Sequence, residues 1–255
     1  MSISVSTLSV TPIKGTRLRT VEAIELGPLG AAGDRRFYVI DERGRMVNGK
    51  VVVDLQTVVA DWSEDTGELA LAFPNGTRVA GIVDGGPEVA TTFFSQPRDA
   101  IVPDGPWSQA LSDHFGRPLR LVGTDSAVDR GHDGGVSLVS SASVARFAEV
   151  ADRDQVDARR FRMLIEIDGV DAHAEDGWVG RRVRVGESEL AFHGHVGRCA
   201  ITTRDPDTAE RDIPTLDLLR AYRADLDTTE PLPFGIYGEV LRGGRIAIGD
   251  PVQPL

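Results

Sequence analysis

Residues 3–13 read ISVSTLSVTPI, with polar and apolar side chains in alternation and many β-branched residues. This pattern is typical of a half-buried β-strand. Residues 36–41, 51–59 and 69–73 have the same character, and turn sequences such as Pro74-Asn75-Gly76 separate them. The first hundred residues therefore predict an all-β module of short strands.

The second half of the chain mixes strands with helices. Apolar side chains spaced along one helix face predict helices at residues 107–116, 142–151 and 213–224, the second of them capped by Ser140-Ser141. Strands are expected at residues 119–123, 162–167, 181–185, 190–195, 236–241 and 245–248, with a hairpin between the third and fourth and a Gly243-Gly244 turn before the last. The predicted fold is mainly β with some α (α+β), in two β-rich modules. A Pro/Gly-rich break near residues 103–118 places the predicted domains at residues 1–115 and 116–255.

Composition limits the possible functions. The chain has 255 residues and a formal net charge of −11, which disfavours nucleic-acid binding because that needs clustered lysine and arginine. No apolar run approaches the roughly 20 residues of a membrane helix, and the first residues lack the features of a signal peptide. A single cysteine excludes an internal disulfide. We therefore expect a cytoplasmic protein with no nucleic-acid or membrane partner.

The single cysteine, Cys199, lies in the stretch Gly-Arg-Cys-Ala-Ile-Thr-Thr at residues 197–203. A lone thiol is either a buried apolar side chain or a reactive nucleophile or metal ligand. Together with His193 and His195 it has a spacing that could provide three zinc ligands. It could also pair with a histidine for nucleophilic catalysis, and nothing in the sequence selects one. The candidates are His132, His173, His193 and His195.

Several basic residues stand at the ends of predicted strands. They are Lys14, the run Asp34-Arg35-Arg36 and the run Arg159-Arg160-Phe161-Arg162. Arginine makes bidentate contacts with phosphates and carboxylates, so these residues could bind an anion. Surface ion pairing with the excess of acidic residues is the alternative. The glycine-rich residues 27–33 match neither a P-loop nor a dinucleotide-binding motif and are interpreted as a tight turn.

An ordered set of short motifs spans nearly the whole chain. In sequence order they are TPIKG (11–15), LGAAGDRRF (29–37), VSSAS (139–143), RFR (160–162), AEDGWVG (174–180), RCAITT (198–203), DPDT (205–208), PFGIY (233–237) and IGDPV (248–252). With this set the chain resembles MOSC-domain proteins that carry an N-terminal MOSC-associated β-barrel domain, of the amidoxime-reducing-component type. The resemblance implies two β-barrel-like modules, the second with short peripheral helices.

The resemblance also implies a molybdenum cofactor, with molybdenum held by molybdopterin. In the family the cysteine of Arg-Cys-x-x-Thr-Thr is the protein ligand to molybdenum, which corresponds to Cys199, and a soft thiolate suits such a metal. Basic residues and hydroxyls hold the pterin and its phosphate. The expected cofactor-binding residues are Lys14, Arg35, Ser140, Ser141, Arg162, Arg198 and Thr202. Cys199, Asp205 and Asp207 are the expected catalytic residues, although Asp-Pro-Asp is also good turn chemistry.

For activity, the resemblance implies a molybdenum-dependent oxidoreductase. Its substrates would be small N-hydroxylated compounds, such as hydroxylamines, amidoximes and N-oxides, reduced by oxygen-atom transfer with electrons from a separate donor protein. Three positions depart from the family pattern: Gly15 replaces a usual serine, Met163-Leu164 replaces Pro-Asn, and Val196-Gly197 lacks a further cysteine or proline. These departures bear on cofactor affinity.

Other functions stay open at the level of sequence. Cys199 could carry sulfur as a persulfide supplied by a partner. The protein could also carry the cofactor without turnover, which the departures at Gly15 and Leu164 would suit. Pyridoxal phosphate, weakly associated with the family, would need Lys14 or Lys50 to form its aldimine, and Lys14 is better explained as an anion contact.

Overall fold

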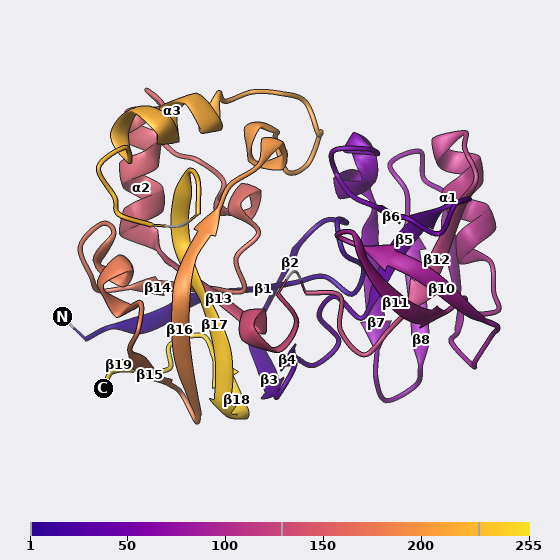
Figure 1. The fold of residues 1–255 in the computed structure, drawn as a ribbon, viewed down its shortest axis with the longest axis horizontal. Coiled ribbons are helices and arrows are strands. Elements are labelled where there is room, and N and C mark those ends of the chain that lie inside the picture. The colour runs from indigo at the N-terminus through magenta and orange to yellow at the C-terminus, as the bar shows by residue number, and fades with distance from the viewer. Residues whose placement is uncertain (1, 129, 229) are drawn as a thin grey trace.

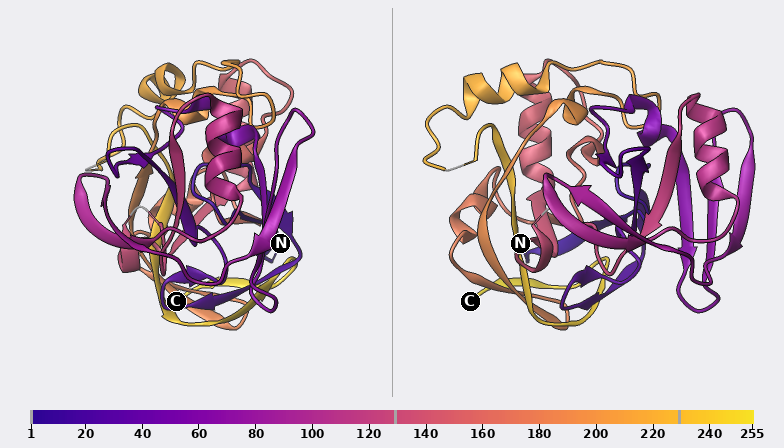
Figure 2. Two further views of the ribbon diagram at one scale, coloured as in Figure 1. Left: turned by 90° about the vertical axis from the view of Figure 1, so that its right-hand side faces the viewer. Right: turned by 45° about the vertical axis from the view of Figure 1, so that its right-hand side comes forward.

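The computed structural model describes residues 2–128, 130–228 and 230–255, and within these residues the strands form four sheets. Figure 1 shows two lobes side by side, both dominated by strands, with the two termini on the larger lobe. The same arrangement is visible in the rotated views (Figure 2). The predicted class, mainly β with some α, is confirmed.

The larger lobe is built on an eight-stranded sheet. In sheet order its strands are β19 (Val252–Pro254), β15 (Arg182–Val185), β16 (Ser188–Gly197), β17 (Pro233–Arg242), β13 (Val136–Ser140), β14 (Ile165–Asp168), β1 (Ser4–Val10) and β2 (Arg19–Val21). A three-stranded sheet of β18 (Gly244–Ala247), β3 (Ala23–Gly27) and β4 (Gly30–Ala31) joins it. Their inward side chains, among them Leu8, Ile165 and Phe192, share one buried apolar core. Burial of this core is the main favourable term in folding.

Helices add a second core to the larger lobe. They are α2 (Ser141–Val150), α3 (Thr215–Tyr222) and the short 3-10 helices η2 (Gly131–Gly134), η3 (Ala158–Phe161), η4 (Ala174–Trp178) and η5 (Ala200–Thr203). Phe147, Phe161 and Phe234 form its aromatic centre, with the rings of Phe161 and Phe234 stacked at a centroid distance of 4.1 Å. This core includes Phe161 at the end of η3 and Met163 just after it.

The smaller lobe consists of two further sheets and one α-helix. The five-stranded sheet runs β10 (Glu88–Phe93), β11 (Gln96–Ile101), β12 (Leu119–Gly123), β5 (Phe37–Asp41) and β6 (Met46–Val47), and the three-stranded sheet runs β7 (Val59–Ser63), β8 (Glu68–Ala72) and β9 (Arg78–Ile82). The helices are α1 (Trp107–Phe115) and the 3-10 helix η1 (Val53–Thr57). Trp107 is fully buried in this core and its indole N–H donates to the Leu69 carbonyl at 2.9 Å.

Strand pairing crosses the predicted division of the chain at residues 115 and 116. β1 pairs with β14, and β3 pairs with β18, so residues 4–31 are hydrogen-bonded into sheets formed by the C-terminal half. The chain enters the smaller lobe after β4 and leaves it after β12. The predicted domain boundary stays a prediction. The N-terminal strands β1 to β4 are part of the sheets of the larger lobe.

One local prediction was wrong. Residues 51–59 were expected to form one strand but form η1 followed by β7, because the Asn48 carbonyl accepts from the backbone N–H groups of Val51 and Val52 and turns the chain. The strand expected at residues 245–248 is confirmed as β18, which pairs with β3. A Cβ at Gly243 would lie 2.3 Å from the Leu26 carbonyl oxygen, so only glycine lets the backbone approach β3 this closely.

Candidate functional site

A cavity of about 490 Å³ is lined by residues from both lobes. The larger lobe contributes Val136 from β13 and Cys199, while the smaller lobe contributes Asn48 and Phe94. A volume of this size is within the range of small-molecule and cofactor sites. The cavity is therefore the candidate functional site.

Two residue types that are rare in this chain, lysine and cysteine, come together in the cavity. It contains both of the chain's lysines and its one cysteine. Among the described lining residues six are basic and one, Asp34, is acidic. The basic residues are Lys14, Arg35, Lys50, Arg130, Arg162 and Arg198. A protein with a net charge of −11 thus has a locally positive cavity, which favours an anionic ligand.

Cys199 lies between the end of β16 and the start of η5 and is half-buried. Its carbonyl accepts from the backbone N–H of Thr202 at 3.1 Å and from the Thr202 hydroxyl at 2.9 Å. The Thr203 hydroxyl donates to the Ala200 carbonyl at 2.7 Å. The two threonines therefore close the turn that holds Cys199 at the cavity, and Thr202, which also lines the cavity, has its hydroxyl engaged in that turn.

Arg198 fixes the cavity wall beside Cys199. Its guanidinium donates to the Phe161 carbonyl at 2.6 Å and to the Phe234 carbonyl at 2.9 Å, and its Nη2 contacts the Met163 sulfur at 2.8 Å. These bonds join the segment after η3, the start of β17 and the segment after β16. Arg198 thus has a structural role in the cavity, in addition to contributing charge.

Arg35 and Arg162 meet where the two lobes join. Arg35 forms an ion pair with Asp34, and its Nη2 donates to the Arg162 carbonyl at 3.2 Å. Arg162 in turn donates to the Thr16 carbonyl at 2.8 Å. Both arginines have a positive φ, 48° and 54°, in the left-handed region that non-glycine residues rarely adopt. Strained residues of this kind cluster at functional sites.

Lys14 follows β1 and approaches two aromatic rings. Its backbone N–H donates to the Phe37 carbonyl at 2.8 Å, which anchors it to the smaller lobe. Its Nζ lies 5.2 Å from the ring centroid of Phe94 and 5.6 Å from that of Phe93. Phe94, at the turn between β10 and β11, also lines the cavity. The ring contacts orient Lys14 while its ammonium group stays at the cavity.

Ser140 and Ser141 are not among the described residues that line the cavity. Ser140 is fully buried and caps α2, with its Oγ accepting from the Ser143 backbone N–H at 3.1 Å. The Ser141 hydroxyl donates to the Ile167 carbonyl at 3.2 Å. The cap was predicted from the sequence. The structure does not bring these two hydroxyls together with Cys199.

Asp205 and Asp207 lie in a turn that follows η5 and are also not among the described lining residues. Burial acts to raise the pKa of Asp205, but hydrogen bonds from the backbone N–H groups of Thr208 and Asp207 outweigh it and lower that pKa. The Arg159 guanidinium holds the pKa of Asp207 below its usual value. Both groups are carboxylates at neutral pH, and their contacts are those of a turn.

None of the five histidines is among the described lining residues of the cavity. The zinc set suggested by sequence spacing is separated, because pairing irregularities in β16 disturb the alternation of its side chains. His193 is exposed and its Nε2 lies 3.1 Å from Glu239, whereas His195 is buried with its Nε2 3.4 Å from Asp176. A Cys–His pair and a zinc site at Cys199 therefore have no geometric basis in these residues.

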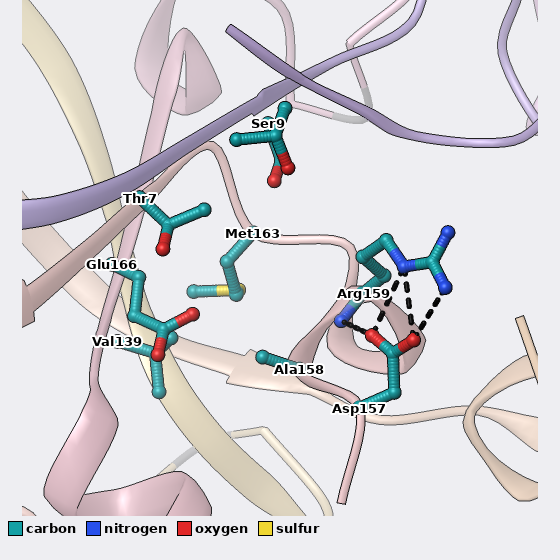
Figure 3. Close-up of a pocket in the computed structure, with 9 residues that line it drawn as sticks. Thr7, Ser9, Val139, Asp157, Ala158, Arg159, Met163 and Glu166 are labelled. Atoms are coloured by element: carbon teal, nitrogen blue, oxygen red, sulfur yellow. Dashed lines mark hydrogen bonds and ion pairs between the residues drawn. The ribbon is translucent and has the colours of Figure 1, made fainter. Parts of the chain in front are cut away.

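A second, smaller cavity of about 230 Å³ lies on the other side of Met163, which lines both. Figure 3 shows Met163 and Glu166 directed toward a common space, with the Asp157–Arg159 ion pair beside it. Burial raises the pKa of Glu166, and a hydrogen bond from Ser141 acts in the opposite direction. Its described lining contains no thiol and one basic side chain, that of Arg159, whereas the larger cavity has six basic side chains.

Most lining residues were not expected from the sequence as part of the site, and four of these carry basic or aromatic side chains that bear on ligand binding. They are Lys50, Phe94, Arg130 and Tyr237. Arg130 stacks over the Tyr237 ring at 4.0 Å and forms an ion pair with Glu230 at 2.5 Å. The rarity of lysine was the one available signal for Lys50, and no local pattern marks the other three.

Comparison with known families gives two matches in chain order. The MOSC N-terminal beta barrel domain matches residues 2–99, and the MOSC domain matches residues 123–253, more than half of the chain. The chain belongs to the MOSC domain family. The resemblance expected from the ordered motifs is confirmed, and the described cavity of this MOSC protein contains the cysteine of its Arg-Cys-x-x-Thr-Thr motif.

Curated relatives of this MOSC protein include two amidoxime-reducing components. Mitochondrial amidoxime-reducing component 1 of Mus musculus is 29% identical over 287 residues, covering 99% of this chain and 82% of that protein. Mitochondrial amidoxime-reducing component 1 of Danio rerio is 28% identical over 281 residues, covering 98% of this chain and 84% of that protein. A molybdenum cofactor sulfurase of Caenorhabditis elegans is 25% identical over 234 residues, covering 89% of this chain and 32% of that protein.

No helix formed by the described residues has both the length and the apolar character needed to cross a membrane. The longest of the three α-helices, α2, has 10 residues, which is half the roughly 20 residues that a membrane-spanning helix requires.

Proposed function

We propose that this protein binds the molybdenum cofactor in the cavity between its lobes and reduces small N-hydroxylated compounds, with Cys199 as the protein ligand to molybdenum. The observation that carries the proposal is the composition of the cavity, where the one thiol of the chain meets six basic side chains. The sequence similarity to two amidoxime-reducing components over nearly the whole chain supports the choice of reaction.

The donor set fits the proposed cofactor. A thiolate is a soft ligand suited to a metal already bound by sulfur, and Cys199 is half-buried and lines the cavity. The pterin phosphate is an anion, for which Lys14, Arg35 and Arg162 supply positive charge from the place where the lobes join. The departure at Gly15 fits the local backbone of this chain, since its φ of +95° is unfavourable for serine or any other residue with a side chain.

The bound cofactor would supply two-electron oxygen-atom-transfer chemistry. The N–O bond of the substrate breaks, two electrons and two protons are taken up, and the products are an amine-type compound and water. The electrons would come from a separate donor protein. The chain's own residues bind and orient: the η5 turn holds the Cys199 sulfur, and Arg198 holds the wall beside it. We propose no proton relay through Asp205 or Asp207, whose contacts are those of a surface turn.

Turnover of a hydroxylamine with an artificial electron donor tests this proposal. We expect Cys199→Ala to abolish reduction while the circular dichroism spectrum and thermal midpoint remain those of the wild type, because Cys199 is half-buried and belongs to none of the described hydrophobic cores. A matched control is Ser2→Ala, at an exposed position that does not line the cavity. Full reductase activity in Cys199→Ala would refute the ligand assignment.

A second candidate function is a carrier of sulfur or of the cofactor without reductase turnover. The similarity to a molybdenum cofactor sulfurase over 89% of this chain favours it. In that case the purified protein would hold molybdenum or a persulfide on Cys199 but would not reduce a hydroxylamine. Mass spectrometry of the intact chain distinguishes a persulfide by the mass of one added sulfur. The cytoplasmic location expected from the sequence stays a prediction.

A further inference from the structure

A cluster of two histidines and two acidic residues lies outside the cavity, where η2 approaches the β16–β17 pair. The Glu239 carboxylate is at its centre: His132 Nδ1 lies 3.2 Å from one oxygen, and His193 Nε2 lies 3.1 Å from the other. Asp133 Oδ1 is 4.0 Å from His132 Nδ1. One ligand atom from each of His132, Asp133 and Glu239 lies within 4.8 Å of the other two.

The cluster is accessible from solvent and comes from three separate segments. The side chains of His132 and His193 are 53% and 39% exposed, and that of Glu239 is 22% exposed. Imidazole nitrogens and carboxylate oxygens are together the donor set that zinc prefers when thiolates are absent.

We infer that His132, Asp133 and Glu239 form a binding site for a divalent transition metal, with zinc as the best match, and that His193 supports the site by holding the second oxygen of Glu239. Zinc–nitrogen and zinc–oxygen bonds of about 2.0–2.2 Å place ligand atoms of a tetrahedral site about 3.3 Å apart. The 3.2 Å separation of His132 Nδ1 from Glu239 is close to that value. Asp133 Oδ1, at 4.0 Å from His132 Nδ1, would move closer when the ion binds.

The position of the cluster gives the ion a structural role. η2 ends at Gly134, and Gly134, Gly135 and Val136 line the large cavity, as does Tyr237, two residues before Glu239 on β17. An ion held by His132 and Asp133 from η2 and by Glu239 from β17 would tie this wall to the sheet. Cys199 is not a ligand of this site, and the inference does not depend on the proposed reductase activity.

The inference is tested by isothermal titration calorimetry. The protein is first freed of metal with a chelator and is then titrated with zinc chloride. We expect saturable binding of one zinc ion per chain. Glu239→Gln and His193→Ala should each weaken that binding by at least about tenfold, since loss of even an outer partner of a metal site costs 10–100-fold. Cys199→Ser should bind zinc as tightly as the wild type, which separates this site from the cavity thiol.

A matched control is Glu189→Gln, a carboxylate on the same β16 strand that pairs with Arg182 instead of with a histidine. Its zinc affinity should equal that of the wild type, and thermal midpoints without metal should show that every variant folds. Anomalous diffraction at the zinc edge should place the ion between Glu239, His132 and Asp133. Unchanged affinity in both Glu239→Gln and His193→Ala, or binding that disappears in Cys199→Ser, would overturn the site.

Discussion

Single residues in this protein separate into those that supply chemistry and those that hold a shape. Cys199, Lys14 and Lys50 belong to types that are otherwise absent from the chain, and all three line one cavity. Arg198 and Thr202 line it too, but their polar groups are engaged with backbone carbonyls of the wall. The sequence motif does not distinguish these roles, because Arg198, Cys199 and Thr202 belong to the same short stretch of the chain.

His173 gives a prediction at this scale, because burial and then the nearby Arg223 lower its pKa from 6.5 to about 4. In the unfolded chain it binds a proton near pH 6.5, so between about pH 6.5 and 4 the unfolded state binds more protons than the folded one. Stability should therefore fall as pH decreases through this window and should be unaffected by this group above it. Urea midpoints at pH 7 and pH 5 measure the difference.

His173→Asn is the informative variant for that measurement. The φ of His173 is 65°, a conformation that asparagine tolerates well, and asparagine does not titrate. The variant should lose less stability than the wild type between pH 7 and pH 5. Equal losses in the two proteins would show that His173 does not contribute to the pH dependence.

At the scale of elements, α2 illustrates how a cap and a ligand can be confused. Ser140 is fully buried and its hydroxyl accepts from the Ser143 backbone N–H. We expect Ser140→Ala to lower the free energy of unfolding by about 1–2 kcal/mol, the usual cost of losing an N-cap, and to leave molybdenum content unchanged. Ser141→Ala, which keeps the cap, should cost less. Urea denaturation and metal analysis of each variant give both quantities. Loss of molybdenum from a Ser140→Ala protein of unchanged stability would show that Ser140 contributes to cofactor binding.

Much of the element pattern could be predicted from local sequence. β5, β12, α1 and the β15–β16 hairpin form where alternation, helical spacing and turn residues placed them. Strand partners could not be predicted, since the pairing of β18 with β3 joins residues more than two hundred positions apart and depends on the whole sheet. For the cavity, Lys14, Arg35, Arg162 and Cys199 lie in short motifs, whereas Arg130 lies in a loop without any pattern.

At the scale of the whole molecule, the turn after η5 joins the two lobes. The Gln56 amide from η1 donates to the Asp205 carbonyl at 2.6 Å, and Arg17 donates to the Asp207 carbonyl at 2.8 Å. Arg159 forms an ion pair with the Asp207 carboxylate at 2.7 Å. The segment that begins with Cys199 is thus tied to both lobes, which explains how a cavity between them keeps its shape.

Gln56 tests this connection because it is 4% exposed. Gln56→Ala leaves the Asp205 carbonyl without this donor, and we expect a loss of about 1–2 kcal/mol in the free energy of unfolding. We also expect faster loss of molybdenum on dilution, because the lobes are less firmly joined. The control is Gln109→Ala, an exposed amide on α1 that contacts only its own helix. If the two variants match each other in stability and molybdenum retention, the turn does not join the lobes.

The most direct measurement is the molybdenum content of the protein purified from a host that makes the cofactor, compared between Arg162→Ala and Arg242→Ala. Arg162 lines the cavity beside Arg35, whereas Arg242 is exposed at the end of β17. We predict stoichiometric molybdenum in the wild type and in Arg242→Ala, and a marked loss in Arg162→Ala. A wild-type protein without molybdenum, or equal molybdenum in the two variants, would contradict a cofactor site between the lobes.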